Sequence, residues 1–223
     1  MGNSKKTSME QAIWLRLLRQ QRILAVIRAS DVTVGLEMAR AVHRAGLRLI
    51  EITWTSDRPV QLIERLRNEF PDAWIGAGTL LSPADLQAAI TAGAQFGFSP
   101  HSDPRLIQLA QEQSLPLTPG ALSPTEIVSA WQAGASGVKV FPVMALGGAA
   151  YIRSLQGPLG HIPLIPTGGV TLDNALPLLN AGAIALGLST SLFPADAVAQ
   201  QDWLRVTQAA QQLLRRIEPF LSN

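Results

Sequence analysis

One lysine lies inside an apolar run, from Gly137 to Pro142, that is predicted to be a buried strand. The other two lysines, Lys5 and Lys6, are in the polar N-terminal segment. Burial disfavours the charged form of a lysine and lowers its pKa, which makes a neutral amine available as a nucleophile. Lys139 is therefore a candidate Schiff-base residue. The alternatives are a stem lying along apolar surface with its amine in water, and a salt-bridged lysine.

A glutamate occupies a comparable position in another predicted strand. Glu51 falls within the apolar run Leu49 to Thr53, and alternate residues of a strand face the same side, so Glu51 and Lys139 could both point into one core. A buried Glu and Lys form either a structural ion pair or a base and nucleophile couple. Because the ion pair costs stability unless it has another role, we favour the couple.

Two glycine-containing loops predict a phosphate site. Thr167, Gly168 and Gly169 follow the seventh predicted strand, and a Gly-Leu-Ser sequence ending at Ser189 follows the eighth. These two loops commonly bind phosphate in (β/α)₈ barrels, through backbone N–H groups at glycines and helix N-termini. Gly168 and Gly169 could instead only form a tight turn. The two loops together favour a phosphorylated substrate.

Eight strand and helix units position these residues. The predicted strands are 23–27, 47–54, 74–79, 96–100, 115–118, 137–142, 163–167 and 184–187. Helix caps are predicted at Asp31, Ser82 and Ser123, the last with capping-box spacing. Units of roughly 20 to 26 residues fit an α/β protein with a (β/α)₈ TIM barrel. The alternative is an open doubly wound sheet, but the sequence lacks the Gly-x-Gly-x-x-Gly motif that such a fold commonly has after its first strand.

We expect a single (β/α)₈ barrel domain over residues 1–223, because no linker or low-complexity segment interrupts the repeats. Residues 1–8 are predicted to be a polar tail, residues 9–20 an N-terminal helix covering one end of the core, and residues 201–217 a closing helix. In such a barrel the active site lies at the C-terminal ends of the strands. The polar residues expected there are Arg28, Glu51, Thr53, Thr79, Ser99, Thr118, Lys139, Thr167 and Ser189.

The composition argues against several other classes of protein. A net charge of +2, with arginines spread along the chain, gives no support for nucleic-acid binding. The absence of cysteine and the three scattered histidines predict no disulfide and no dedicated metal site. The polar N-terminus and the lack of a run of about 18 apolar residues predict a cytoplasmic protein without membrane association.

Five short motifs, in order and at these separations, carry a family resemblance. They are Glu51-Ile52-Thr53, Gly76-Ala77-Gly78-Thr79, Phe98-Ser99-Pro100, Lys139-Val140-Phe141-Pro142 and Pro166-Thr167-Gly168-Gly169. Over residues 23–194 the chain resembles the 2-keto-3-deoxy-6-phosphogluconate (KDPG) / 4-hydroxy-2-oxoglutarate (KHG) aldolase family.

The resemblance implies a class I, metal-independent and cofactor-free aldolase, usually a homotrimer. Such an enzyme cleaves KDPG to pyruvate and glyceraldehyde 3-phosphate, or KHG to pyruvate and glyoxylate. It implies that Lys139 forms the Schiff base and that Glu51 moves protons through a bound water. The remaining site residues implied are Gly78, Thr79, Pro100 and Thr167 for the substrate, and Gly168, Gly169 and Ser189 for its phosphate.

The chain departs from the family at one position. Members specialised for KDPG often carry an arginine four residues after the glutamate, where this chain has Thr55. Arg28 matches an arginine of other members and could hold the substrate carboxylate with its planar fork, although it could also be a surface salt-bridge partner. Arg58 is a weaker candidate because it is expected to begin a helix. The departure leaves open which 2-keto acid and which C4 configuration are preferred.

Two other functions fit part of the same pattern. A sugar-phosphate epimerase-type barrel would use Glu51 and Lys139 for proton exchange without a covalent bond. A non-catalytic barrel would bind a phosphorylated metabolite and regulate a partner, but binding alone gives no reason to bury a lysine opposite a glutamate.

Overall fold

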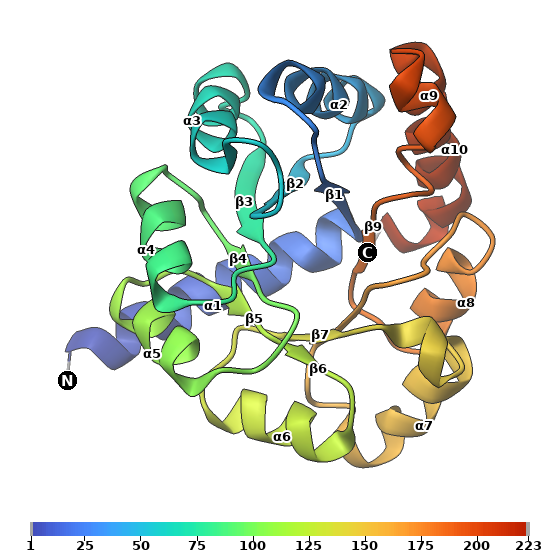
Figure 1. The fold of residues 1–223 in the computed structure, drawn as a ribbon. Helices are drawn as coiled ribbons and strands as arrows, with labels where there is room; N and C mark the ends of the chain where they lie inside the picture. Colours follow the sequence, from blue (N-terminus) through green and yellow to red (C-terminus); the bar gives the residue numbers. More distant parts are fainter. Residues whose placement is uncertain (1, 222–223) are drawn as a thin grey trace.

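The computed structural model describes the backbone of residues 2–221 and the side chains of residues 9–221. Its strands form a parallel, curled sheet surrounded by helices (Figure 1). The strands are β1 (Ile23–Ile27), β2 (Leu49–Thr53), β3 (Trp74–Gly78), β4 (Gly97–Phe98), β5 (Leu117–Thr118), β6 (Gly120–Ala121), β7 (Val138–Val140), β8 (Leu164–Pro166) and β9 (Leu186–Leu188). The α/β barrel predicted from the sequence is thereby confirmed.

The ring of strands is closed at two places by local contacts. Strands β5-β4-β3-β2-β1-β9 form one hydrogen-bonded sheet and β6-β7-β8 the other. The fifth predicted strand, 115–118, corresponds to β5, and the short strand β6 that follows it was not predicted. Only Pro119, which cannot donate to the ladder, separates the two. On the other side, a bridge joins Thr167 to Gly187, and Ile184 N donates to Leu164 O at 3.1 Å.

Every strand except β5, which leads into β6, is followed by a helix on the outside of the barrel (Figure 1). The helices are α1 (Gly2–Gln21), α2 (Val32–Ala45), α3 (Pro59–Glu69), α4 (Pro83–Thr91), α5 (Pro104–Glu112), α6 (Pro124–Gln132), the 3₁₀ helix η1 (Val143–Leu146), α7 (Ala149–Leu159), α8 (Ala175–Asn180), α9 (Ala195–Ala199) and α10 (Trp203–Leu221). The predicted caps are present: Asp31 and Ser82 accept from the backbone of their helices, and Ser123 and Glu126 form the capping box. No helix among the described residues is long and apolar enough to cross a membrane.

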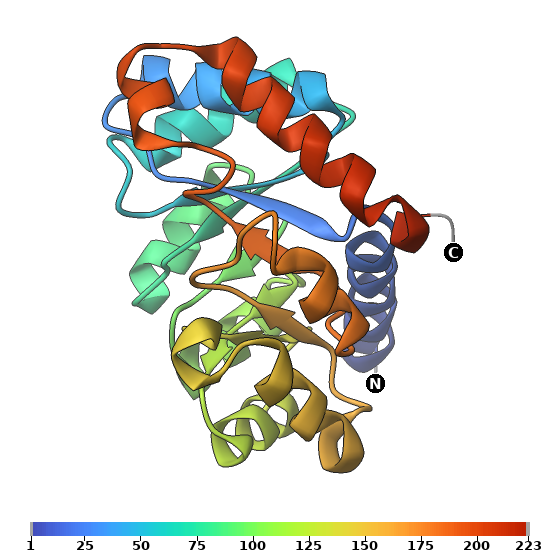
Figure 2. The ribbon, with the colours of Figure 1, turned by 90° about the vertical axis from the view of Figure 1, so that its right-hand side faces the viewer.

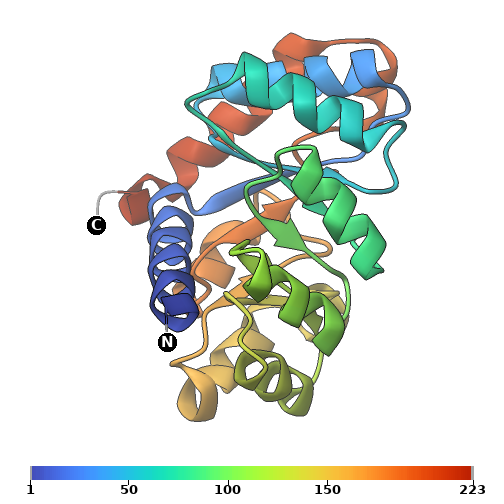
Figure 3. The same ribbon diagram turned by 90° about the vertical axis from the view of Figure 1, so that its left-hand side faces the viewer.

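Helix α1 lies across one end of the barrel, as Figures 2 and 3 show from opposite sides. Trp14 and Leu18 are fully buried on its inner face. The Trp14 ring stacks on Phe96, with centroids 4.7 Å apart, and meets Phe98 edge-on at 6.1 Å. Its Nε1 donates to Thr118 Oγ1 at 3.4 Å, so α1 is fixed to the barrel floor by packing and by a hydrogen bond.

Two predicted boundaries need correction. Helix α1 begins at Gly2, so the backbone of residues 2–8, expected as a polar tail, continues the helix. These residues include no proline, and extending an existing helix avoids the cost of nucleation, although they carry no apolar periodicity that would predict it. The closing helix α10 runs from Trp203 to Leu221 rather than over 201–217, and Asp202 Oδ1 accepts from Arg205 N at its start.

The packing of α1 predicts the effect of truncating its tryptophan. Trp14→Ala should lower the free energy of unfolding by about 3 to 5 kcal/mol, because it removes a large buried ring and leaves a cavity on the barrel floor. Urea unfolding followed by circular dichroism measures this change. Met9→Ala, on the same helix but 65% exposed, is the matched control and should change stability by less than about 0.5 kcal/mol. Equal effects of the two substitutions would contradict a packed floor.

Candidate active site

A cavity of about 700 Å³ opens at the C-terminal ends of the strands. Its size falls in the range of small-molecule sites. The predicted site residues that line it are Arg28, Glu51, Thr79, Pro100, Lys139, Thr167, Gly168, Gly169 and Ser189. Residues contributed by seven different strands and their loops therefore meet in one place, as parallel strands in a barrel require. Thr53 also lines the cavity, whereas Gly78, Ser99 and Thr118, which were expected at this end of the barrel, do not.

Lys139 lies in the middle of β7 with only 5% of its surface exposed. Its Nζ lies 5.0 Å from the centroid of the Phe141 ring and 5.9 Å from that of Phe98. Ring faces attract a cation, but they accept no proton and leave the amine free to react. Among the described residues no carboxylate lies within ion-pair distance of Lys139. The salt-bridge alternative is therefore wrong.

Glu51 is buried in β2, with 1% exposure, and faces the same cavity. Neither carboxylate oxygen has a hydrogen-bond partner among the described residues. Burial raises the Glu51 pKa, and the charges of Lys139 and Arg28 oppose this rise in part. A buried carboxyl group with free oxygens and a raised pKa is suited to accept and donate protons.

Gly78 explains how the carboxyl group of Glu51 finds room. A Cβ atom at Gly78, on the neighbouring strand β3, would overlap Glu51 Oε1 and Cδ. The Glu51 carboxyl group thus occupies the space that a side chain at residue 78 would need. The residue lies beside the catalytic candidate rather than on the cavity wall.

Thr79, directly after β3, has a feature that the sequence does not predict. Its φ of 60° places a β-branched residue in the left-handed region, which such residues rarely adopt. A conformation of this kind costs of order 1 to 3 kcal/mol and persists where surrounding structure imposes it, often at ligand sites. The surrounding structure thus holds Thr79 in a strained conformation where it lines the cavity.

The far side of the cavity is formed by the loops after β8 and β9. Gly168 and Gly169 both have left-handed backbone conformations, with φ of 89° and 78°. Thr167 precedes them, and its buried Oγ1 has no hydrogen-bond partner among the described residues. Ser189 faces these residues from the neighbouring loop. Backbone amides and hydroxyl groups thus dominate this side, without a lysine or arginine at these positions.

Arg28 follows β1 and is exposed at the cavity mouth. Within the described chain it takes part in no ion pair, so the surface salt-bridge interpretation is wrong. Arg58 does not line the cavity; it precedes α3 and pairs with Asp57 at 2.9 Å. Arg28 is therefore the guanidinium available to an anionic ligand.

The sequence-based site omitted an apolar wall. Val26, Met38, Phe193 and Val198 also line the cavity, and they come from β1, α2, the loop after β9 and α9. Buried apolar residues are the most common kind in any core, so only the fold reveals that these four border a cavity.

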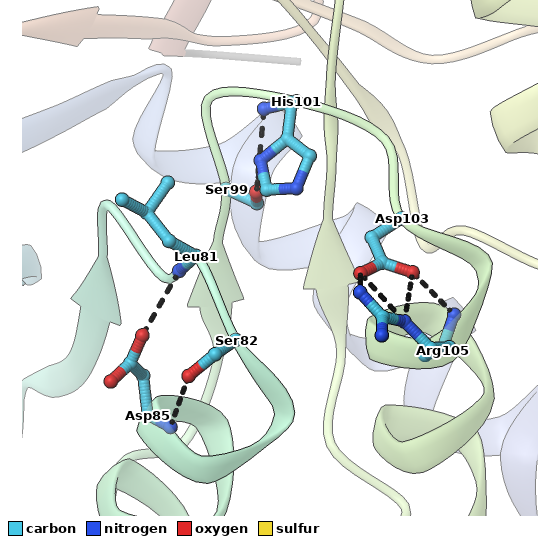
Figure 4. Close-up of polar contacts among 7 residues, drawn as sticks. All are labelled: Leu81, Ser82, Asp85, Ser99, His101, Asp103 and Arg105. Atoms are coloured by element: carbon cyan, nitrogen blue, oxygen red, sulfur yellow. Dashed lines mark hydrogen bonds and ion pairs between the residues drawn. The ribbon is translucent and has the colours of Figure 1, made fainter.

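Two side chains near the predicted site lie outside the cavity. Trp54 is half-buried and packs against the core. His101 is exposed, with Nδ1 3.1 Å from Ser99 Oγ, and borders a separate cavity of about 210 Å³ (Figure 4). The two loops drawn in Figure 4 continue from Thr79 and Pro100 into α4 and α5, where Ser82 and Asp103 cap the helices.

The arrangement combines a nucleophile, a base and an anion-binding surface. The Lys139 amine can add to a carbonyl carbon, and the Glu51 carboxyl group can exchange protons beside it. Within the described residues, no three His, Cys, Asp or Glu side chains come together in a way that could hold a metal ion. The geometry defines a barrel enzyme that can form an imine with a carbonyl compound.

Comparison with known proteins identifies the family. The family model for KDPG and KHG aldolases matches residues 15–209. A 2-dehydro-3-deoxy-phosphogluconate aldolase of Pseudomonas aeruginosa is 36% identical over 200 residues, which cover 90% of this chain and 91% of the relative. The KHG/KDPG aldolase of Escherichia coli is 31% identical over 207 residues, covering 93% and 95%.

A solved structure agrees with this assignment. The KDPG aldolase of Legionella pneumophila, with pyruvate captured as a covalent carbinolamine, has a TM-score of 0.83 and 27% identity, over 88% of this chain and 95% of that one. The chain belongs to the KDPG and KHG aldolase family, whose members are lyases.

The raised pKa of Glu51 predicts how a substitution changes stability with pH. The folded protein holds the Glu51 proton more tightly than the unfolded chain, so ionisation opposes folding from the ordinary pKa of 4.5 upward through the raised value. Glutamine cannot ionise, so Glu51→Gln should be more stable than the parent by an amount that grows as the pH rises through this window. Urea unfolding at several pH values measures the difference.

Glu126 supplies a control of opposite sign. Backbone hydrogen bonds from Ser123 and Leu122 lower its pKa, so its ionised form stabilises the fold above pH 4.5 and this contribution is lost as the pH falls through the lowered value. Glu126→Gln should therefore be less stable than the parent at neutral pH. A pH-independent effect of Glu51→Gln would contradict an ionisation cost at Glu51.

Proposed function

We propose that the protein is a class I aldolase that cleaves KDPG to pyruvate and glyceraldehyde 3-phosphate. One observation carries the proposal: a single cavity contains a buried lysine without an ion pair and a buried carboxyl group whose oxygens have no hydrogen-bond partner among the described residues. The names of the relatives from Pseudomonas aeruginosa and Escherichia coli, and the pyruvate carbinolamine in the Legionella pneumophila enzyme, support the same chemistry.

The proposed reaction begins at the keto carbon of the substrate. The Lys139 amine adds to C2, and loss of water from the carbinolamine gives an iminium ion, with Glu51 moving the protons through a bound water. Glu51 then takes the proton of the C4 hydroxyl group. The C3–C4 bond breaks, its electron pair enters the iminium to form an enamine, and the aldehyde is released. Protonation of the enamine at C3 and hydrolysis of the imine release pyruvate and restore the amine.

The remaining residues would bind the two ends of the substrate. Arg28 would hold the pyruvate carboxylate, together with Thr79 and the backbone at Gly78, while Pro100 would border this half. Thr167, whose Oγ1 is free, would contact the substrate near the scissile bond. The loops carrying Gly168, Gly169 and Ser189 would hold the phosphate.

The loops after β8 and β9 favour KDPG over the shorter KHG as substrate. Cleavage of KHG to pyruvate and glyoxylate would use the same lysine and glutamate but would leave these loops without a phosphate to bind. Because Thr55 replaces the arginine of KDPG-specialised members, Arg28, which is exposed and unpaired at the cavity mouth, would bind the carboxylate instead.

Trapping with pyruvate and borohydride tests the proposal. One reduced pyruvyl adduct is expected by intact mass, and peptide mapping should place it on Lys139. Lys139→Met keeps the apolar volume and should form none, and Glu51→Gln should slow cleavage of KDPG by about 10² to 10⁴. Folded parent protein that forms no adduct would instead favour the epimerase-type alternative.

Arg28→Gln should require on the order of tenfold more pyruvate for half-maximal adduct formation, because it removes charge-assisted hydrogen bonds to the carboxylate.

We also propose a homotrimer, as is usual in the family, and a cytoplasmic location. Light scattering coupled to size-exclusion chromatography should give about three times the chain mass of 23.9 kDa. A monomeric mass at micromolar concentration would contradict the trimer while leaving the aldolase proposal intact.

A further inference from the structure

The loop that begins at Thr167 has three successive carbonyl groups held from outside the cavity. Val143 N donates to Thr167 O at 3.0 Å and Met144 N donates to Gly168 O at 3.4 Å, both from η1. The third carbonyl, Gly169 O, accepts from the side-chain amide of Asn174 at 2.9 Å. None of these three donor residues lines the cavity, so the carbonyl groups point away from it.

The geometry of the peptide bond then fixes the direction of the amides. In a planar trans peptide the N–H points opposite to the C=O. The N–H groups of Gly168, Gly169 and Val170 therefore point toward the cavity that these residues line. Among the described residues no acceptor is bonded to any of them. Three convergent backbone N–H groups form a concave anion-binding surface.

Of the three donors, only that of Asn174 belongs to a side chain. Both the oxygen and the nitrogen of its amide are hydrogen-bonded. Its Oδ1 accepts from Thr171 N at 2.7 Å while its Nδ2 donates to Gly169 O. Its Nδ2 also lies 3.5 Å from the sulfur of Met144, which links it to η1. The residue thus fixes the peptide plane that separates Gly169 from Val170, although it lies outside the cavity.

We propose that Asn174 is a positioning residue for the phosphate end of the substrate, and that Val170 N is a third phosphate donor beside the amides of Gly168 and Gly169. This inference rests on the proposed function, since it concerns the phosphate of the same substrate. Without the Asn174 amide, the Gly169 carbonyl loses its partner and the following peptide can rotate. The Val170 N–H would then no longer converge with its two neighbours. Lys139 and Glu51 lie on other strands and keep their geometry.

Two matched substrates separate this role from a structural one. Asn174→Ala should raise KM for KDPG on the order of tenfold with little change in kcat, because one oriented amide is lost. KM and kcat for 2-keto-3-deoxygluconate, which differs only in lacking the phosphate, should stay within about twofold. Asn174→Asp keeps the acceptor for Thr171 N but loses the donor to Gly169 O, so it should impair KDPG binding at least as much as Asn174→Ala.

Thr171→Ala is the matched control in the same turn. Thr171 Oγ1 accepts from Asn174 N at 3.3 Å but does not touch Gly169, so this variant should leave KM for KDPG unchanged. Equal losses on both substrates in Asn174→Ala, or no loss on either, would overturn the proposal.

A readout that needs no turnover distinguishes this inference from the proposed function. In a deuterated, ¹⁵N-labelled sample, titration with inorganic phosphate should shift the amide signals of Gly168, Gly169 and Val170 in the parent, with the Val170 shift lost in Asn174→Ala. This result would stand even if borohydride trapping gave no adduct. Unchanged Val170 signals in the parent would overturn the inference even if Lys139 forms its adduct.

Discussion

The structure depends on holding two buried ionisable groups in one cavity without an ion pair between them. Lys139 and Glu51 are both almost fully buried, yet no ion pair joins them, and the Glu51 carboxyl oxygens have no hydrogen-bond partner among the described residues. Leaving a buried polar group unpaired costs stability, and a barrel with a large apolar core can bear that cost. The surrounding strands fix each group, since a one-residue shift of a strand would turn its side chain out of the barrel.

Much of this arrangement could be predicted from the sequence because barrels impose strong rules. Apolar runs predicted the strands, capping residues predicted the helix starts, and the rule that sites lie at strand ends brought Lys139 and Glu51 together. Strand β6 was not predicted, because Gly120 and Ala121 follow a proline and form too short a run to indicate a strand. No pattern in residues 2–8 predicts that α1 starts at Gly2, because the extension of a helix needs no apolar periodicity.

The parts of the site that could not be predicted depend on three-dimensional proximity. Nothing in the sequence around Thr79 indicates a left-handed backbone, since threonine rarely adopts it. Gly78 was assigned to substrate binding, yet its place against Glu51 is visible only when neighbouring strands are in register. Asn174 lies in a polar turn whose composition fits any helix start. Its bond to Gly169 O appears only in the folded loop.

Helix α1 has a consequence for the surroundings of the Lys139 amine. Trp14 meets Phe98 edge-on, and the Phe98 ring in turn lies beside the Lys139 amine, so the helix is linked to the lysine through one aromatic ring. The cavity lies on the other side of this lysine, at the C-terminal ends of the strands. A change in the packing of α1 would therefore reach the amine from below, through Phe98, and not through the loops that border the cavity.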